Sequence, residues 1–218
     1  MLFQKEYFSN PEIVNVNALA DTAYFIPYKT RESALRLNRR DSEYLTFLNG
    51  EWDFKLFPSV YDVTERFFDN DFDTSGYDKI SVPSVWQFKG YEVPYYVTSP
   101  YPIPFDPPNV PYANPLGAYS RKFNIKKREN KKYVISLEGV ATAYFLYING
   151  DFIGYAETAH CTTNFDITDS LRDGENKISV AVLKWQALLI LRIRICTDIT
   201  EFSVTFIYPK EKRMVYPI

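Results

Sequence analysis

The chain is short of the residues on which most catalytic and metal sites depend. Its 218 residues include one histidine, His160, and two cysteines, Cys161 and Cys196. Two cysteines so far apart indicate reduced thiols rather than a disulfide framework or a zinc site. A Ser-His-Asp or Cys-His mechanism would have to use His160, and Cys161 beside it would point to the opposite face of a strand. We therefore predict no catalytic residue and no metal ligand set in this chain.

Net charge and long apolar runs are also missing. The 25 basic and 27 acidic residues nearly cancel, which leaves a formal charge of -2 and no electrostatic footprint for nucleic acid or an anionic membrane. No apolar window is long enough for a transmembrane helix, and the N-terminus lacks the pattern of a secretory signal. These observations predict a soluble, cytoplasmic protein that binds neither nucleic acid nor a membrane.

Aromatic residues, in contrast, are plentiful at 17% of the chain, and they occur in short β-prone segments. The segments after residue 117 are 118–125, 133–137, 141–148, 152–156 and 177–185. No long amphipathic helix interrupts them. Short strands at this spacing predict an all-β fold, a β-sandwich or jelly roll, and residues 1–40 read as an N-terminal arm packed on it.

Two Asn-Gly pairs predict tight hairpin turns, because both turn positions need positive φ. Asn149-Gly150 is one of them, and Asn49-Gly50 is the other, joining Tyr44–Leu48 to Glu51–Phe57. In the latter strand apolar residues alternate with charged ones. That alternation predicts one buried face and one wet face.

Most of the fourteen prolines lie between Val82 and Gly117, in a stretch that is also rich in aromatic residues. Proline fixes φ and removes a backbone donor, so this stretch is predicted to be an extended irregular loop rather than a helix or a central strand. A long, stiff, aromatic loop between strands is typical of a functional surface. Aromatic rings can stack on the apolar face of a sugar, which favours sugar recognition, although core packing would also explain any single ring.

Many short motifs along the chain occur together in one family. They are Leu48-Asn-Gly-Glu-Trp-Asp-Phe54, Val82-Pro-Ser-Val-Trp-Gln87, Gly90-Tyr-Glu-Val-Pro94, Tyr101-Pro102, Pro107-Pro108, Val110-Pro111, Asn114-Pro-Leu-Gly117, Gly139-Val, Ile148-Asn-Gly150, Gly154-Tyr155, Phe165-Asp-Ile-Thr168 and Gly174-Glu-Asn176. In order and spacing, from about Asn10 to Trp185, they resemble the N-terminal sugar-binding domain of glycoside hydrolase family 2 β-galactosidases.

The resemblance implies a galactose-binding-like jelly roll that precedes an immunoglobulin-like domain and a TIM barrel. In that family the barrel carries the two catalytic glutamates of a retaining mechanism on β-galactosides such as lactose. A barrel needs roughly 250 residues, so the resemblance implies that this chain does not hydrolyse sugars alone. Family enzymes often use Mg²⁺ and Na⁺, whose ligands lie mostly in the other domains, and they are expected to be homo-oligomers.

The resemblance also implies which residues meet the sugar. The family has an asparagine in a Tyr-Thr-Asn sequence that contacts galactosyl hydroxyls, and Thr98 occupies the matching position in Tyr96-Val-Thr-Ser99. We accordingly predict a substrate-binding set of Thr98, Tyr96, Ser99 and Trp86. A second family contact, the aspartate of Trp-x-Asp-Gly-Ser-Tyr, is missing here, because Lys184-Trp185 is followed by Gln186-Ala187.

The resemblance stops after about residue 186. Synonymous codons can be chosen for Leu188 to Tyr208 so that reading from the third nucleotide gives Ser-Tyr-Leu-Glu-Asp-Gln-Asp, followed further on by Gly-Ile-Phe-Arg-Asp-Val, as in the family. The hypothesis is that one nucleotide was lost near codons 186 and 187. The predicted division is an arm at 1–40, a jelly roll at 41–187 and a frameshifted tail at 188–218, expected to pack poorly but β-prone enough around Phe202 to Tyr208 to pair with an open edge.

Three functions remain open from the sequence. The first is the sugar-binding part of a β-galactosidase, separated from its catalytic domains. The second is a free-standing carbohydrate-binding module, which would bind galactosides alone. The third is a purely structural remnant, which would bind nothing.

Overall fold

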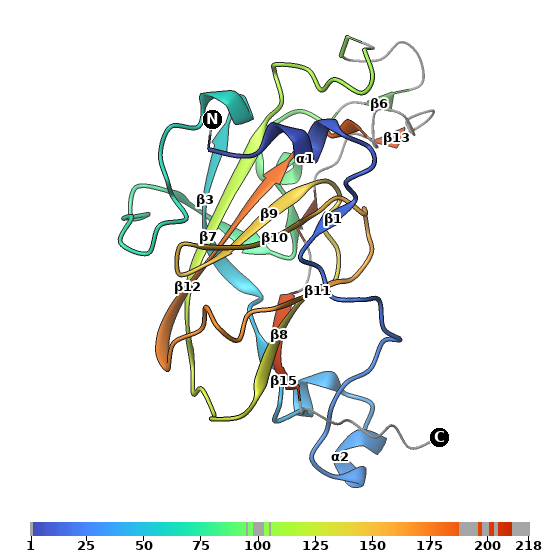
Figure 1. The fold of residues 1–218 in the computed structure, drawn as a ribbon, viewed down its shortest axis with the longest axis vertical. Helices are drawn as coiled ribbons and strands as arrows, with labels where there is room; N and C mark the ends of the chain where they lie inside the picture. The colour runs from blue at the N-terminus through green and yellow to red at the C-terminus, as the bar shows by residue number, and fades with distance from the viewer. Residues whose placement is uncertain are drawn as a thin grey trace.

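Two antiparallel β-sheets packed face to face make up the body of the computed structural model (Figure 1). The structure describes residues 2–94, 103–104 and 106–187, together with the backbone of four short strands at 96–97, 196–197, 201–202 and 205–210. The all-β jelly-roll prediction is confirmed by this architecture.

The larger sheet has the strand order β1-β10-β9-β12-β7-β3-β4. Its strands are β1 (Asn15–Val16), β10 (Asp151–Ala156), β9 (Tyr144–Ile148), β12 (Gly174–Leu183), β7 (Leu116–Ile125), β3 (Gly50–Phe57) and β4 (Asp78–Val82). The smaller sheet has the order β11-β8-β15-β2, with β11 at Thr163–Asp166, β8 at Lys132–Leu137, β15 at Thr205–Lys210 and β2 at Thr46–Phe47. Two further short pairs are β5 (Ser84–Val85) with β14 (Glu201–Phe202), and β6 (Tyr96–Val97) with β13 (Cys196–Thr197).

The larger sheet is buried on both faces. Ile178, Val180 and Val182 of β12 belong to the core between the sheets, whereas Ala181 and Leu183 belong to a second core on the outer face. The outer core is covered by the short helix α1 (Lys5–Ser9) and by the chain around Val60–Phe68. This double burial explains why β12 reads as a continuous apolar run rather than as an alternating strand.

Asn49-Gly50 does not form the predicted hairpin. β2 pairs with β15 of the small sheet, whereas β3 pairs with β4 and β7 of the large one, so the chain crosses between sheets at this point. Side chains satisfy the carbonyls there: the Trp52 indole donates to Leu48 O at 2.8 Å, and Arg121 Nη1 donates to Leu48 O at 2.7 Å and to Asn49 O at 2.6 Å. Gly50 still needs its positive φ of 120°, but for a crossover rather than for a hairpin.

Asn149-Gly150 is a hairpin turn, as predicted. Both residues have positive φ, 53° and 94°, and Ile148 pairs directly with Asp151 across β9 and β10. In β3 the inner residues Trp52 and Phe54 are buried, as the alternation predicted.

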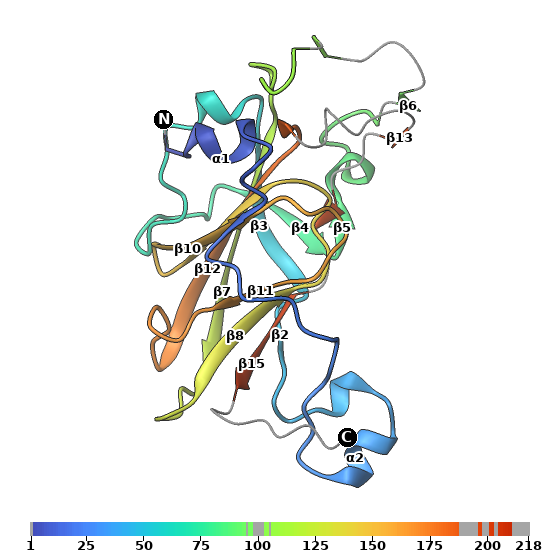
Figure 2. The same ribbon diagram turned by 45° about the vertical axis from the view of Figure 1, so that its right-hand side comes forward.

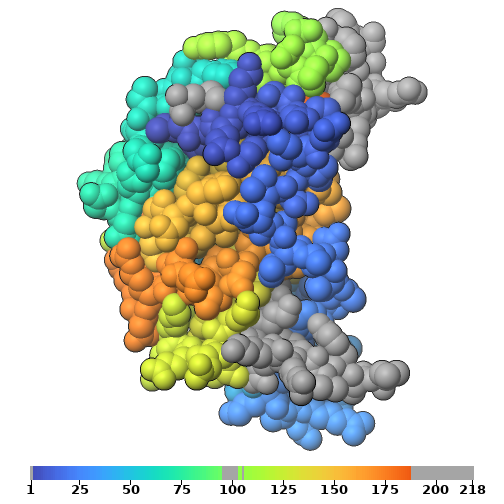
Figure 3. Space-filling view, viewed as in Figure 1, coloured from blue at the N-terminus to red at the C-terminus, as the bar shows by residue number. Residues whose placement is uncertain are grey.

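The N-terminal arm contributes more than a cover. Its β1 adds an edge strand to the large sheet by pairing with β10. Beyond it lie α2 (Arg31–Leu35), which buries none of its residues, and the 3₁₀ turn η1 (Arg39–Asp41). Figures 1 and 2 place α2 at the end of the molecule opposite α1, and Figure 3 shows the blue N-terminal residues running across the face of the sandwich. The domain boundary at residue 40 stays a prediction.

Where the structure describes it, the proline-rich stretch is irregular, as predicted, except for β5, β6 and one short 3₁₀ turn, η3 (Trp86–Lys89). Another 3₁₀ turn, η2 (Val60–Asp62), lies earlier in the chain. In the C-terminal segment the backbone of β15 lies between β8 and β2, which agrees with the expected β-pairing of residues 202–208. The expectation that the tail side chains pack poorly falls outside the described residues.

Candidate functional site

Trp86 lies at the start of the proline-rich loop, in η3, and is fully buried. Its Nε1 donates to Glu92 Oε2 at 2.8 Å, and its ring centroid lies 6.1 Å from that of Phe54. The ring also fills the space beside Gly117, where a Cβ would overlap it. Because no face of the ring is exposed, Trp86 supports the loop from beneath in this structure.

Glu92 and Lys184 form an ion pair under the same loop. Lys184 Nζ lies 2.9 Å from Glu92 Oε1, and the two side chains are only 4% and 19% exposed. Both carboxylate oxygens of Glu92 are therefore used, one by Lys184 and one by Trp86. A buried charge that has lost its partner is costly, so this pair ties the loop firmly to the end of β12.

Asn114 makes the second link between the loop and the end of β12. Its buried side chain donates through Nδ2 to Trp185 O and accepts at Oδ1 from Trp185 N, both at 2.8 Å. The backbone nitrogen of Lys184 adds a bond to Pro115 O at 2.9 Å. The amide of Asn114 thus pairs with the backbone as a strand would, at a point where the prolines prevent regular pairing.

The two residues after Trp185, Gln186 and Ala187, are both buried. Gln186 Nε2 donates to Glu157 O at 2.9 Å, and Ala187 is fully buried where the family has its aspartate. Tyr155 donates its hydroxyl to Glu157 Oε2 at 2.7 Å, and burial together with the nearby carboxylate raises the pKa of Tyr155. This side of the loop is therefore closed by packing and presents no carboxylate at position 187.

The predicted sugar contacts follow directly after this anchored segment. The backbone of Tyr96 pairs with Thr197, and that of Val97 with Cys196, in the β6–β13 pair. Thr98 and Ser99 lie outside the described residues, and of Tyr96 only the backbone is described. The structure thus fixes the base of the loop through Glu92 and Trp86, and the roles of Tyr96, Thr98 and Ser99 stay predictions.

His160 and Cys161 are both exposed, in the turn before β11. His160 has a positive φ of 58°, and its backbone nitrogen bonds Val140 O at 3.3 Å. Within the described ranges, no three His, Cys, Asp or Glu side chains come together as a metal site. No helix in the same part of the chain is long and apolar enough to cross a membrane.

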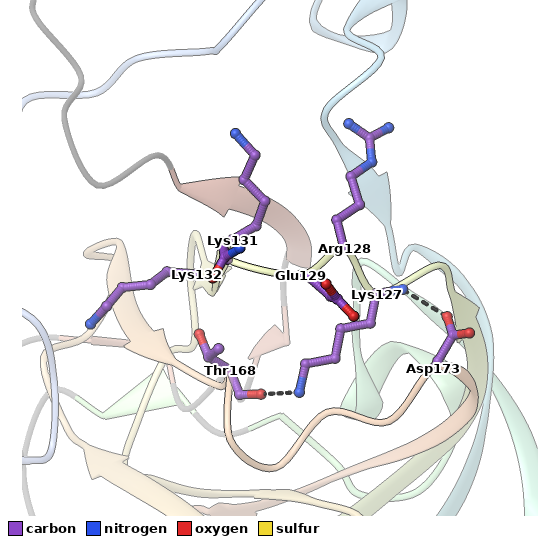
Figure 4. Close-up of a pocket in the computed structure, with 8 residues that line it drawn as sticks. Lys127, Arg128, Glu129, Lys131, Lys132, Thr168 and Asp173 are labelled. Atoms are coloured by element: carbon purple, nitrogen blue, oxygen red, sulfur yellow. Dashed lines mark hydrogen bonds between the residues drawn. The ribbon is translucent and has the colours of Figure 1, made fainter.

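A basic cavity of about 520 Å³ lies at the β7–β8 turn (Figure 4). Lys127 Nζ points inward and donates to Thr168 O at 2.7 Å and to Leu171 O at 2.8 Å, while its backbone nitrogen donates to Asp173 Oδ1 at 2.9 Å. Lys127 therefore fastens two turns together. Among the described residues no aromatic ring lines this cavity, which gives it no support as a sugar site.

The anchoring residues Glu92, Lys184 and Asn114 are not recognisable as a group from the sequence. One signal was present: Lys184 directly follows the apolar run of β12, where a charge needs a partner. Its partner lies 92 residues away in the chain, a pairing that only the fold reveals.

Two antiparallel sheets with a long loop pinned across one end define a jelly-roll domain of the galactose-binding type. Residues 45–210 match the family described as "Glycosyl hydrolases family 2, sugar binding domain". The chain belongs to this family. The match passes residue 186 and includes β15, while the frameshift itself stays a hypothesis that the gene sequence decides.

Curated relatives agree with the family. The chain is 41% identical over 179 residues to a β-galactosidase of Actinobacillus pleuropneumoniae, covering 82% of this chain and 17% of that protein. It is 38% identical over 186 residues to a β-galactosidase of Staphylococcus xylosus, covering 84% and 18%. The chain therefore spans less than a fifth of the length of these relatives.

Solved structures show the same fold. A β-glucuronidase from glycoside hydrolase family 2 aligns with a TM-score of 0.59 and 19% identity, covering 77% of this chain and 18% of that one. A β-glucuronidase of an uncultured Clostridium aligns with a TM-score of 0.55 and 18% identity, covering 78% and 30%. At this identity the likeness supports the fold alone.

Proposed function

We propose that this chain forms one wall of a galactoside-binding site in a family 2 β-galactosidase, whose hydrolytic chemistry lies outside these 218 residues. The observation that carries the proposal is the pinning of the loop at Glu92 by Lys184 and Trp86, just before the predicted contact segment. A wall that contacts a substrate must be held in place, and a buried ion pair serves that purpose. The relatives named β-galactosidase support the substrate class.

Within this proposal, Tyr96, Thr98 and Ser99 contact the galactosyl hydroxyls and Trp86 supports them from below. The Thr98 hydroxyl can both donate and accept a hydrogen bond, but it is shorter than an asparagine amide and offers fewer positions. No residue of this chain is assigned to bond cleavage or to Mg²⁺ or Na⁺. The parent enzyme is proposed to be a cytoplasmic homo-oligomer.

An activity assay tests whether hydrolysis requires residues outside this chain. The purified 218-residue chain should show no turnover of a chromogenic β-galactoside, because the family's catalytic glutamates belong to the barrel. Clear turnover that resists further purification would contradict the proposal.

Calorimetry separates the proposal from a free-standing carbohydrate-binding module. Half a pocket should bind lactose too weakly to give heat at millimolar concentration, whereas a module would give heat that Tyr96→Ala removes. Binding heat that Tyr96→Ala removes would favour the free-standing module. If no such heat is measured, the module is excluded.

A further inference from the structure

A groove of about 470 Å³ lies between the edge strands of the two sheets, β1 and β11. The N-terminal arm forms one wall, and Thr163 and Asn164 of β11 with the turn before it form the other. Ser136 of β8 and Ala156 of β10 also line it. Its volume falls within the range of roughly 300–1,000 Å³ that is usual for small-molecule pockets.

The arm is fixed over this groove by backbone and side-chain bonds. Leu19 N donates to Asn164 O at 2.8 Å, Asn17 Nδ2 to Ile153 O at 3.0 Å, and Glu157 N to Val14 O at 3.1 Å. Ala18 also packs against the core between the sheets. The groove is therefore formed before any ligand arrives, and binding would not have to order its walls.

Tyr24 provides an exposed aromatic ring in the arm wall of the groove. Tyr24 is 64% exposed and lines the groove. Arg39 Nη1 donates to its hydroxyl at 3.5 Å and is itself held by both oxygens of Glu138, at 2.9 and 2.7 Å. The ring is thus tethered at its polar end while most of its surface remains available.

The remaining described lining is mixed: it is free of Lys, Arg and His, and its apolar members are Val14, Ala18, Ala23, Phe25 and Ala156. It contains hydroxyl, amide and carboxylate groups, among them Thr22, Thr158, Thr162, Asn15 and Asp21. Arg39, which reaches the Tyr24 hydroxyl, is already paired with both oxygens of Glu138, and Asp21 adds a negative charge, so the groove does not favour a phosphate or another anion. A purely apolar ligand would leave the hydroxyl and amide groups unpaired. An uncharged polyol with one apolar ring face matches both the ring and the hydroxyls.

We infer that this groove is a second carbohydrate site, which takes an uncharged mono- or disaccharide with one sugar ring stacked on Tyr24. It is independent of the loop around Thr98, since it is built from the arm and from β11. A domain of this family would then carry two sugar contacts, one at the end of β12 and one at the open edge of the sandwich.

Cys161 lines the same groove and is exposed, so it reports occupancy directly. In the 218-residue chain carrying Cys196→Ser, the rate of maleimide alkylation of Cys161 should fall about tenfold at a lactose concentration ten times its dissociation constant. Glycerol at the same concentration controls for nonspecific polyol effects and should not slow alkylation. If lactose leaves the rate unchanged, or if glycerol slows it equally, the inference is wrong.

Three variants locate the protection. Tyr24→Ala should weaken lactose binding about tenfold through loss of the stacking ring. Tyr112→Ala, a matched control at a tyrosine that is 68% exposed, should leave protection intact. Thr98→Ala should also leave it intact; loss of protection with Thr98→Ala but not with Tyr24→Ala would place the sugar at the loop and overturn the inference.

Discussion

A buried asparagine makes side-chain hydrogen bonds at each end of β12, but one of them joins turns of the sandwich and the other holds the long loop. At its start, Asn176 accepts from Arg172 N at 2.8 Å, donates to Arg172 O at 2.9 Å and accepts from Asn149 Nδ2 at 2.8 Å. At its far end, Asn114 pairs with Trp185, and Lys184 pairs with Glu92. The first network joins turns that neighbour one another in the sandwich, whereas the second holds a long loop from 71 and 92 residues away.

This difference indicates what each end is for. Lys177, at the first end, places its ammonium on the carbonyls of Asp69 and Phe72, so every partner there is a turn of the sandwich itself. The second end uses a charge pair to hold a loop whose own prolines prevent regular pairing. Loss of the first network should affect stability alone, and loss of the second should affect both stability and the presentation of the loop.

The largest expected effect is that of Lys184→Met. Removing the ammonium leaves the Glu92 carboxylate buried without its cation, which should lower the free energy of unfolding by about 3–5 kcal/mol in urea titrations. The double variant Lys184→Met/Glu92→Gln removes both charges and should recover part of the loss. If the double variant is no more stable than the single one, the ion pair does not hold the loop.

Asn114→Ala should have the next largest effect and lower the free energy of unfolding by about 2–3 kcal/mol, because two buried backbone groups of Trp185 lose their partner. Asn109→Ala is the matched control: Asn109 lies in the same loop, and its side chain donates to the exposed Asp106 at 3.1 Å. The control should change stability little in the same urea titration. Equal losses for both variants would contradict the role of Asn114.

Asn176→Ala sharpens the comparison between the two ends. The loss of unfolding free energy should be similar, about 2–3 kcal/mol, because Arg172 and Gly174 lose buried partners. Amide hydrogen exchange of residues 90–93 should nevertheless stay at its original rate, whereas Asn114→Ala should speed it. Faster exchange in the loop of both variants would mean that the two ends are not separate.

A smaller effect concerns the tyrosines between the two ends. Burial raises the pKa of Tyr119 and of Tyr144 above the ordinary value of 10.0. Below pH 10 both keep their proton in the folded and unfolded states; above it only the unfolded state ionises, so the free energy of unfolding should fall by about 1.4 kcal/mol per pH unit for each. Tyr144→Phe should flatten that fall in urea titrations from pH 9 to 11, and an unchanged slope would contradict it.

Strands, fold class and the Asn149-Gly150 hairpin could be predicted because they depend on local pattern and turn chemistry. The crossover at Asn49-Gly50 could not, because the same dipeptide suits a hairpin and only long-range partners such as Arg121 decide between the two. The burial of the outer face of the large sheet could not be predicted either, because its cover comes from α1 and the chain around Val60.

The position of the loop in the candidate site could be predicted from its prolines and from the family motifs. It did not reveal that Trp86 lies under the loop, because burial of an aromatic ring depends on tertiary packing against Phe54 and Gly117. Glu92 and Lys184 were missed for the same reason: they pair across 92 residues of the chain.

The end of β12 is proposed to hold the loop as a wall that contacts galactosides. Amide NMR spectra of the 218-residue chain during a lactose titration test this role, because they detect binding too weak for calorimetry. We expect the amide signals of Tyr96, Thr98 and Ser99 to shift progressively as lactose is added. Lys184→Met/Glu92→Gln should reduce these shifts, whereas Asn176→Ala should leave them unchanged. Unmoved amides at 96–99 in the unaltered chain would contradict this role.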